Sequence, residues 1–159
     1  MNIAEQWGLP VDFQPVRFDI TEDVKNVLRE ALDSDEPVIV SITNRAGSVA
    51  LLATPLRIFY VKTGELSGVG VTGCKVKEFP WEGITKLVAQ QAADNLKIAI
   101  HYRTSNGSRV ETGARAALGG PAVDHLAAFD LEKGTLAFDA IKAVWQLKRP
   151  KPKDSWYGD

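Results

Sequence analysis

Seven short β-rich runs follow one another between residues 38 and 112, and they constrain the fold more than any other feature. Most of them are followed within a few residues by proline, glycine or asparagine. Such breaks favour antiparallel strands with tight connections, because parallel neighbours need long crossovers. The predicted strands are residues 38–43, 49–53, 57–62, 75–79, 84–90, 96–102 and 108–112, and an Asn-Gly hairpin turn is predicted before the last one.

Helical periodicity is found on both sides of these runs. Thr21 is a predicted N-cap, and apolar residues then recur at the spacing of one helix face up to Leu32. After the last predicted strand, residues 121–132 predict one short helix. Gly134 then interrupts the helical pattern. Residues 136–148 predict a longer helix with Ile141 and Trp145 facing inward.

The first 36 residues differ from the rest in charge. They carry nine acidic and three basic residues, whereas residues 37–123 carry five acidic and ten basic ones. Before the first predicted helix, an arm without regular period holds four large apolar side chains, Trp7, Leu9, Phe13 and Phe18. These side chains must cover either the chain's own sheets or a neighbouring copy, and we expect a homo-oligomer.

Two segments together resemble a known family. Residues 51–61 read LLATPLRIFYV and resemble the L-x-A-T-x-x-R strand–turn–strand signature of bacterial pleckstrin-homology-like (PH-like) and GRAM-like domains. Residues 78–87 read EFPWEGITKL and resemble the F-P-aromatic-x-x-I segment of the same domains. The resemblance implies a mainly β fold with helices (α+β), namely a seven-stranded antiparallel barrel or sandwich capped by a C-terminal helix. It divides the chain into an N-terminal arm and helix (1–36), a PH-like domain (37–149) and a flexible tail (150–159).

What the resemblance implies about function is a binding module that carries no catalytic residues. Protein binding or self-association is the first expectation. An anionic lipid headgroup is the alternative, with Arg45, Lys62, Lys75 and Lys77 as its candidate ligands. Phosphoinositide-binding relatives place bases across their first two strands, and here residues 49–53 contain none. A small ligand-binding or enzymatic barrel is a third, weaker reading.

Composition and motifs exclude several other classes. A net charge of −1 argues against a nucleic-acid binder. With Cys74 as the only cysteine, and with His101 and His125 lacking second ligands at a recognised spacing, we expect no disulfide, metal or cofactor. The glycines of residues 68–73 match G-x-G-x-x-G, but a strand-like segment follows them where a dinucleotide site needs a helix. The first residues resemble no signal peptide, and we expect a cytoplasmic protein.

Overall fold

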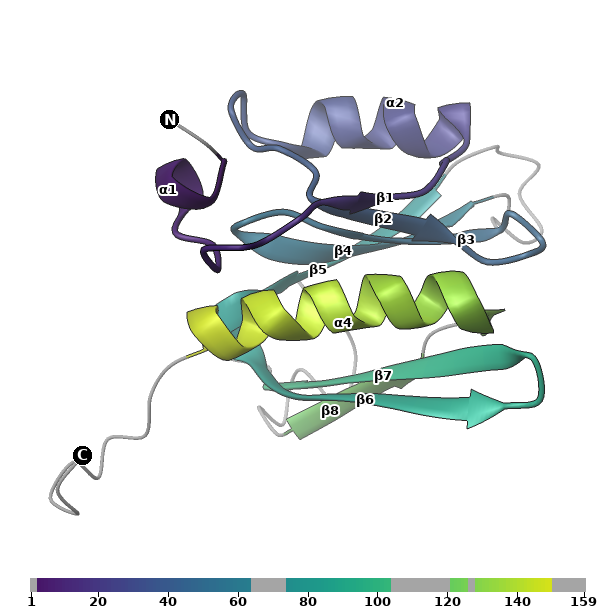
Figure 1. Ribbon diagram of the computed structural model, residues 1–159. Helices are drawn as coiled ribbons and strands as arrows, with labels where there is room; N and C mark the ends of the chain where they lie inside the picture. Colours follow the sequence, from purple (N-terminus) through teal and green to yellow (C-terminus); the bar gives the residue numbers. More distant parts are fainter. Residues whose placement is uncertain (1–2, 64–73, 104–120, 126–127, 150–159) are drawn as a thin grey trace, which may run out of the picture.

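Two packed β-sheets form the body of a mixed α+β fold, as the computed structural model shows (Figure 1). The structure describes residues 3–63, 74–103, 121–125 and 128–149. The first sheet has the order β1-β2-β3-β4-β5, with strands Val16–Arg17, Val40–Thr43, Val49–Ala53, Arg57–Thr63 and Cys74–Pro80. The second sheet has the order β6-β7-β8, with β9 also on β7, and its strands are Ile84–Ala92, Asn95–Arg103, Pro121–His125 and Phe129–Asp130. Neighbouring strands are antiparallel, except that β1 is parallel to β2.

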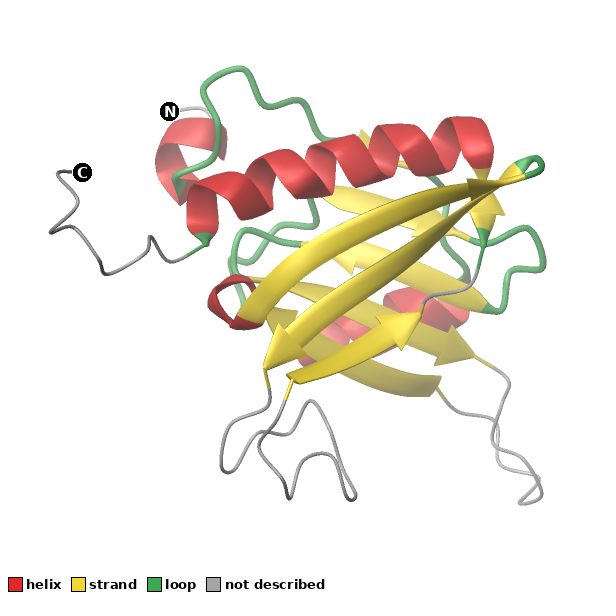
Figure 2. Cartoon of the chain, turned by 90° about the horizontal axis from the view of Figure 1, so that it is seen from below, coloured by secondary structure: helices red, strands yellow, loops and turns green. Residues whose placement is uncertain are grey.

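The helices occupy three different places around these sheets. Helix α2 (Glu22–Ala31) covers the outer face of the first sheet (Figure 1). The short α1 (Ile3–Trp7) lies near one end of the same sheet. The long C-terminal helix α4 (Leu131–Lys148) runs along the open side between the two sheets, as Figure 2 shows from a second direction. A helix in this position covers sheet edges that would otherwise expose unpaired backbone groups.

The first sheet is buried on both faces, which explains the purely apolar sequence of β3. Val49, Leu51 and Ala53 face the second sheet and α4 in the main core. Ala50 and Leu52 point the other way and pack beneath α2. A strand covered on both sides needs no polar alternation, so residues 49–53 read as a continuous hydrophobic run.

Helix α2 confirms the helix predicted from the periodicity that follows Thr21. The Thr21 side chain accepts a hydrogen bond from the backbone N–H of Val24 at 3.4 Å, and Glu22 and Asp23 occupy the first turn. Val24 and Leu28 are the buried contacts of this helix with the first sheet. Cap, first-turn charges and apolar face therefore all act as the sequence indicates.

Six of the seven predicted strands are confirmed, as is the two-sheet arrangement with a C-terminal helix, but the barrel is not closed. The chain passes from β5 to β6 through a 3₁₀ turn at Trp81–Gly83, and no ladder joins the two sheets within the described residues. Trp81 is buried at this corner and donates its indole N–H to the Thr54 carbonyl at 2.9 Å. Phe79 and Ile84 point into the core on either side of the corner. The predicted strand 108–112, its Asn-Gly turn, the glycines of 68–73 and the tail lie outside the described residues.

The helix predicted at residues 121–132 is wrong. Strands β8 and β9 pair with β7 in this region, and α4 begins at Leu131. Asp130 caps α4 by accepting from the Lys133 N–H at 3.1 Å. Gly134 lies inside the helix rather than before it, and it is buried there. A Cβ at this position would lie 3.3 Å from the Cβ atoms of Leu96 and Phe129. Close packing on β7 and β9 thus outweighs the low helix propensity of glycine.

The N-terminal arm packs on its own sandwich. Ala4 and Leu9 are buried in the main core, and Trp7, Phe13 and Phe18 pack against it. Strand β1 extends the first sheet by pairing Val16 with Val40. The chain itself therefore covers the apolar residues that the sequence argument assigned to either the sheets or a neighbouring copy. Self-association through the arm stays a prediction, but the need to cover these apolar side chains no longer favours it.

Candidate protein-interaction surface

Three of the four candidate basic residues are brought together by the β4–β5 ladder. Lys62 pairs directly with Lys75, and Lys77 is two residues further along β5. Ile58 is four positions from Lys62 on β4, and Phe79 is two positions from Lys77 and four from Lys75 on β5. Residues at even spacings share one face of a strand, and Ile58 and Phe79 lie in the main core, so all three lysines are on the face that looks toward the second sheet. Strand β5 is an edge strand, where lysines also prevent pairing with other chains.

Arg45 lies apart from the three lysines and has a structural role. It follows β2 in the turn to β3, where its guanidinium donates to the Asp94 carbonyl at 3.1 Å and to Asp130 Oδ1 at 3.0 Å. Asp130 also caps α4, and the hydrogen bond from the Lys133 backbone holds the pKa of its carboxyl below the ordinary value. Arg45 thus joins the first sheet to the start of α4 rather than completing a lysine cluster.

The most buried charged group in the described part of the chain is Glu36, which sequence reasoning missed. Its side chain is 0% exposed and accepts from Arg57 Nε at 3.0 Å and from Arg57 Nη2 at 2.5 Å. The Thr54 hydroxyl and the Asp33 backbone N–H also donate to its carboxylate. Glu36 precedes Pro37 within an acidic stretch, and no local pattern distinguishes it from its exposed neighbours Asp33 and Asp35.

This network explains why the A-T-x-x-R signature has its particular residues. Thr54 Oγ accepts from the backbone N–H of Leu56 at 3.1 Å and of Arg57 at 3.2 Å, which closes the turn between β3 and β4. Arg57 also donates to Glu78 on β5 at 2.8 Å and to the Ala31 carbonyl at the end of α2. The signature therefore ties α2 to two strands, and its polar groups are occupied in doing so.

The pKa directions agree with a structural network. Burial by itself raises the pKa of Glu36, but hydrogen bonds from Arg57, Thr54 and the Asp33 backbone outweigh it and leave the pKa below its ordinary value. The hydrogen bond to Glu36 in turn raises the pKa of Arg57. Both groups stay charged near neutral pH, so neither is poised for proton transfer.

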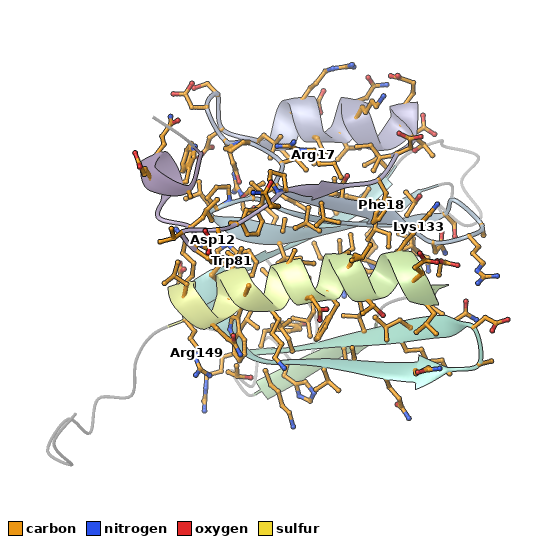
Figure 3. All side chains as sticks on the ribbon, viewed as in Figure 1. Asp12, Arg17, Phe18, Trp81, Lys133 and Arg149 are labelled. Atoms are coloured by element: carbon orange, nitrogen blue, oxygen red, sulfur yellow. The ribbon has the colours of Figure 1, made fainter. Side chains whose placement is uncertain are left out.

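The outer side of the N-terminal arm and α4 form an apolar groove. Residues 10–14 and Val16 form one wall, and Leu136, Ala140 and Ala143 of α4 form the other, with Asp139 among them. Figure 3 shows Asp12, from the arm wall, beside α4. The groove exists because the arm crosses α4 after Leu9 has entered the core.

Large apolar side chains remain in water along this surface. Val11 is 88% exposed, and Leu136 and Leu147 on α4 are 52% and 53% exposed. At the C-terminal end of α4, Lys148 Nζ donates a hydrogen bond to the Trp7 carbonyl at 2.8 Å. Burial lowers the pKa of Lys148. At the N-terminal end, Lys133 lies 5.6 Å from the ring centre of Phe18 (Figure 3). We call the groove together with the exposed leucines of α4 the α4 surface.

Other candidate chemistry gains no support from the geometry of the described residues. His101 is half-buried on the face of β7 opposite Ile100 and Tyr102. Among residues 3–63, 74–103, 121–125 and 128–149, no three histidine, cysteine or acidic side chains gather as metal ligands. None of the helices described has the length and apolar character to cross a membrane. No family model matches the chain, and neither the curated proteins nor the solved structures contain a significant match to it.

Proposed function

We propose that this chain is a non-catalytic interaction module on a PH-like sandwich, and that its α4 surface binds protein. The PH-like assignment is supported by the order of the two sheets and the helix that follows them. The turn and corner residues Thr54, Arg57 and Trp81, which carry the sequence resemblance, all make specific structural contacts. With a single cysteine and no possible intrachain disulfide, the chain suits a reducing compartment, and we place it in the cytoplasm.

The observation that carries the binding proposal is the exposure of Val11, Leu136 and Leu147. Fully burying a leucine is worth about 1.5–3 kcal/mol, so each half-exposed leucine leaves about 1 kcal/mol available to a partner. Isolated exposed leucines are ordinary, whereas Val11 and Leu136 line one groove and Leu147 follows on the same side of α4. An apolar groove with a polar rim is typical of a protein contact site.

Site-specific photo-crosslinking in cells of the source organism tests this proposal. A photoreactive amino acid replaces Leu136 in one variant and the exposed Lys97 of β7, as a matched control, in another. We expect a discrete protein adduct from position 136 and none from position 97. Adding Leu147→Glu to the first variant should abolish that adduct. Equal labelling from both positions, or an adduct that persists with Leu147→Glu, would contradict binding at the α4 surface.

An anionic ligand is the second candidate, and the β4–β5 register favours it. Like charges directly opposite each other, such as Lys62 and Lys75, destabilise a ladder, and a bound anion would relieve that repulsion. Lys62 and Lys77 also have contacts within the chain, which is why protein binding stands first.

Vesicle cosedimentation separates the two candidates. Phosphatidylcholine vesicles are compared with and without phosphatidylglycerol, at low and high salt. Anionic binding predicts salt-sensitive cosedimentation that is lost in the triple variant Lys62→Gln, Lys75→Gln, Lys77→Gln. The matched control is Lys86→Gln with Lys97→Gln, two exposed lysines of the second sheet, which should change nothing. Absence of binding to phosphatidylglycerol vesicles excludes the membrane candidate.

A further inference from the structure

We infer that residues 3–14 form a detachable strap, and that docking of this strap on α4 assembles the groove of the α4 surface. This inference rests on the proposed function, because it concerns the regulation of the same surface. It is carried by the way the strap is fastened to the sandwich and by its place in the groove, where residues 10–14 form most of one wall.

The strap is fastened near its two ends and exposed between them. Toward the N-terminus, Ala4 and Leu9 are each 6% exposed and belong to the main core. After the strap, the chain enters β1, where the Val16 N–H donates to the Ile39 carbonyl at 3.0 Å. Between these points Val11 is 88% exposed. A segment that buries so few apolar side chains opens at a lower free energy than the core of the same fold.

The N-terminal part of the strap forms one local unit. The Leu9 N–H donates to the Ala4 carbonyl at 2.9 Å, and Gly8 between them has a φ of +66°. This is the Schellman arrangement that ends a helix, and here it brings the two buried side chains together. Helix α1 has only five residues, which is too short to be stable in isolation. The unit therefore depends on docking, and we expect it to dock and leave as a whole.

Helix α4 both fastens the strap and supplies the other wall of the groove. Lys148 Nζ donates to the Trp7 carbonyl at 2.8 Å, so the C-terminal end of α4 holds the last residue of α1 (Figure 2). Leu136, Ala140 and Ala143 of the same helix face residues 10–14 across the groove. Docking of the strap at the end of α4 thus fixes the distance between the two walls.

Opening of the strap removes the groove but leaves the two sheets paired, because the pairing of β1 with β2 begins after the strap, at Val16. A protein that contacts both walls binds only the closed form. Its apparent affinity is therefore reduced in proportion to the fraction of closed molecules, and its binding in turn stabilises the closed strap.

Amide hydrogen exchange of the full chain, followed residue by residue by NMR, tests whether the strap opens separately. The reporters of the strap are the Leu9 N–H and the Phe13 N–H, which donates to the Pro10 carbonyl at 3.0 Å. The reporters of the sandwich are the amides of β3, which is paired on both sides. We expect Leu9 and Phe13 to be less protected than β3 and to share one free energy of opening.

Two matched glycine variants decide whether strap and sandwich are separate units. Gly8→Ala strains the docked strap, and Gly47→Ala imposes the same kind of strain, at a φ of +75°, in the turn between β2 and β3. Each should speed β3 exchange by about tenfold, because each destabilises the native state. Only Gly8→Ala should also speed Leu9 and Phe13, since the strain at Gly47 is equal with the strap open or closed. Equal acceleration of Leu9 and β3 by Gly47→Ala, or acceleration of Leu9 without Phe13 by Gly8→Ala, would overturn the strap.

A variant that holds the strap open tests its link to binding. Leu9 lies in the core, so Leu9→Asp would bury a carboxylate in the closed form and should leave the strap open. We expect the β3 amides to remain protected and the photo-crosslinked adduct from position 136 to be lost. Loss of β3 protection would show that the strap is not detachable, and an undiminished adduct would show that it does not control the groove. If the unmodified chain gives no adduct, the proposed function fails, while the exchange data still decide whether the strap opens separately.

Discussion

Removing the guanidinium of Arg57 should destabilise the fold more than any surface change, because it isolates a buried carboxylate. The substitution Arg57→Met retains most of the aliphatic volume and removes both hydrogen bonds from Arg57 to Glu36. Glu36 then keeps only the Thr54 hydroxyl and the Asp33 backbone N–H as donors, while its side chain remains 0% exposed.

The expected loss follows from the contacts that disappear. Each hydrogen bond to a charged group contributes about 1.5–3 kcal/mol, and breaking a buried ion pair by removing one partner typically costs about 3–5 kcal/mol. The bond from Arg57 to Glu78 adds at most about 1 kcal/mol, since the Glu78 side chain is 43% exposed. We therefore expect Arg57→Met to lower the free energy of unfolding by about 3–5 kcal/mol at neutral pH.

Urea unfolding followed by tryptophan fluorescence at several pH values measures this loss and tests its cause. In the unaltered protein the pKa of Glu36 is lowered, so its stabilising contribution is present above the unfolded-state pKa and lost as pH falls through the folded-state pKa. Without Arg57, burial should raise the folded-state pKa of Glu36 above the unfolded value. The deficit of Arg57→Met should then shrink as pH falls from about 7 toward about 4.

Two controls make the argument refutable. The double variant Glu36→Gln with Arg57→Met removes the buried charge and should recover a large part of the loss. Glu78→Gln removes only the exposed partner and should cost less than about 1 kcal/mol. A loss below about 1 kcal/mol for Arg57→Met, or a deficit that does not change with pH, would show that Glu36 is not held as an isolated buried carboxylate.

Two further predictions concern α4. Trp145→Phe removes the buried hydrogen bond from the indole N–H to the Ile84 carbonyl at 3.0 Å and should cost about 0.5–1.5 kcal/mol in urea unfolding. Trp145→Ala should cost about 3–5 kcal/mol. A cost below about 1 kcal/mol for Trp145→Ala would mean that α4 does not cover the core. Gly134→Ala should lower the thermal midpoint despite the better helix propensity of alanine, because its Cβ would meet Leu96 and Phe129 at 3.3 Å; a higher midpoint would show that β7 and β9 move aside easily.

The strands and α2 could be predicted because their signals are local. Periodicity over five to ten residues and the turn residues between them set the position of β3, which is predicted and observed at residues 49–53. The same is true of α2, whose cap, first-turn acids and apolar face lie within residues 21–32. Local chemistry also places the tight turn at Thr54, where the hydroxyl bonds backbone groups two and three residues later.

The helix predicted at residues 121–132 was wrong because the structure of this segment depends on distant partners. Residues 121–125 become β8 by pairing with the edge of β7, a contact that no local period encodes. Gly134 reads as a helix break in sequence, yet it lies inside α4, where a Cβ would come within 3.3 Å of the Cβ atoms of Leu96 and Phe129. Packing thus places inside a helix a residue whose intrinsic helix propensity is low.

For the candidate site, the sequence by itself determined which residue types are present, and the tertiary structure decided which of them meet. Four basic residues were selected from their strands, but only the β4–β5 register shows that Lys62, Lys75 and Lys77 share a face and that Arg45 instead contacts Asp130. The α4 surface arises because the arm packs against the helix and leaves Leu136 exposed. Such surfaces depend on contacts between segments more than a hundred residues apart, whereas sequence patterns report only the side chains that neighbouring positions place on one face.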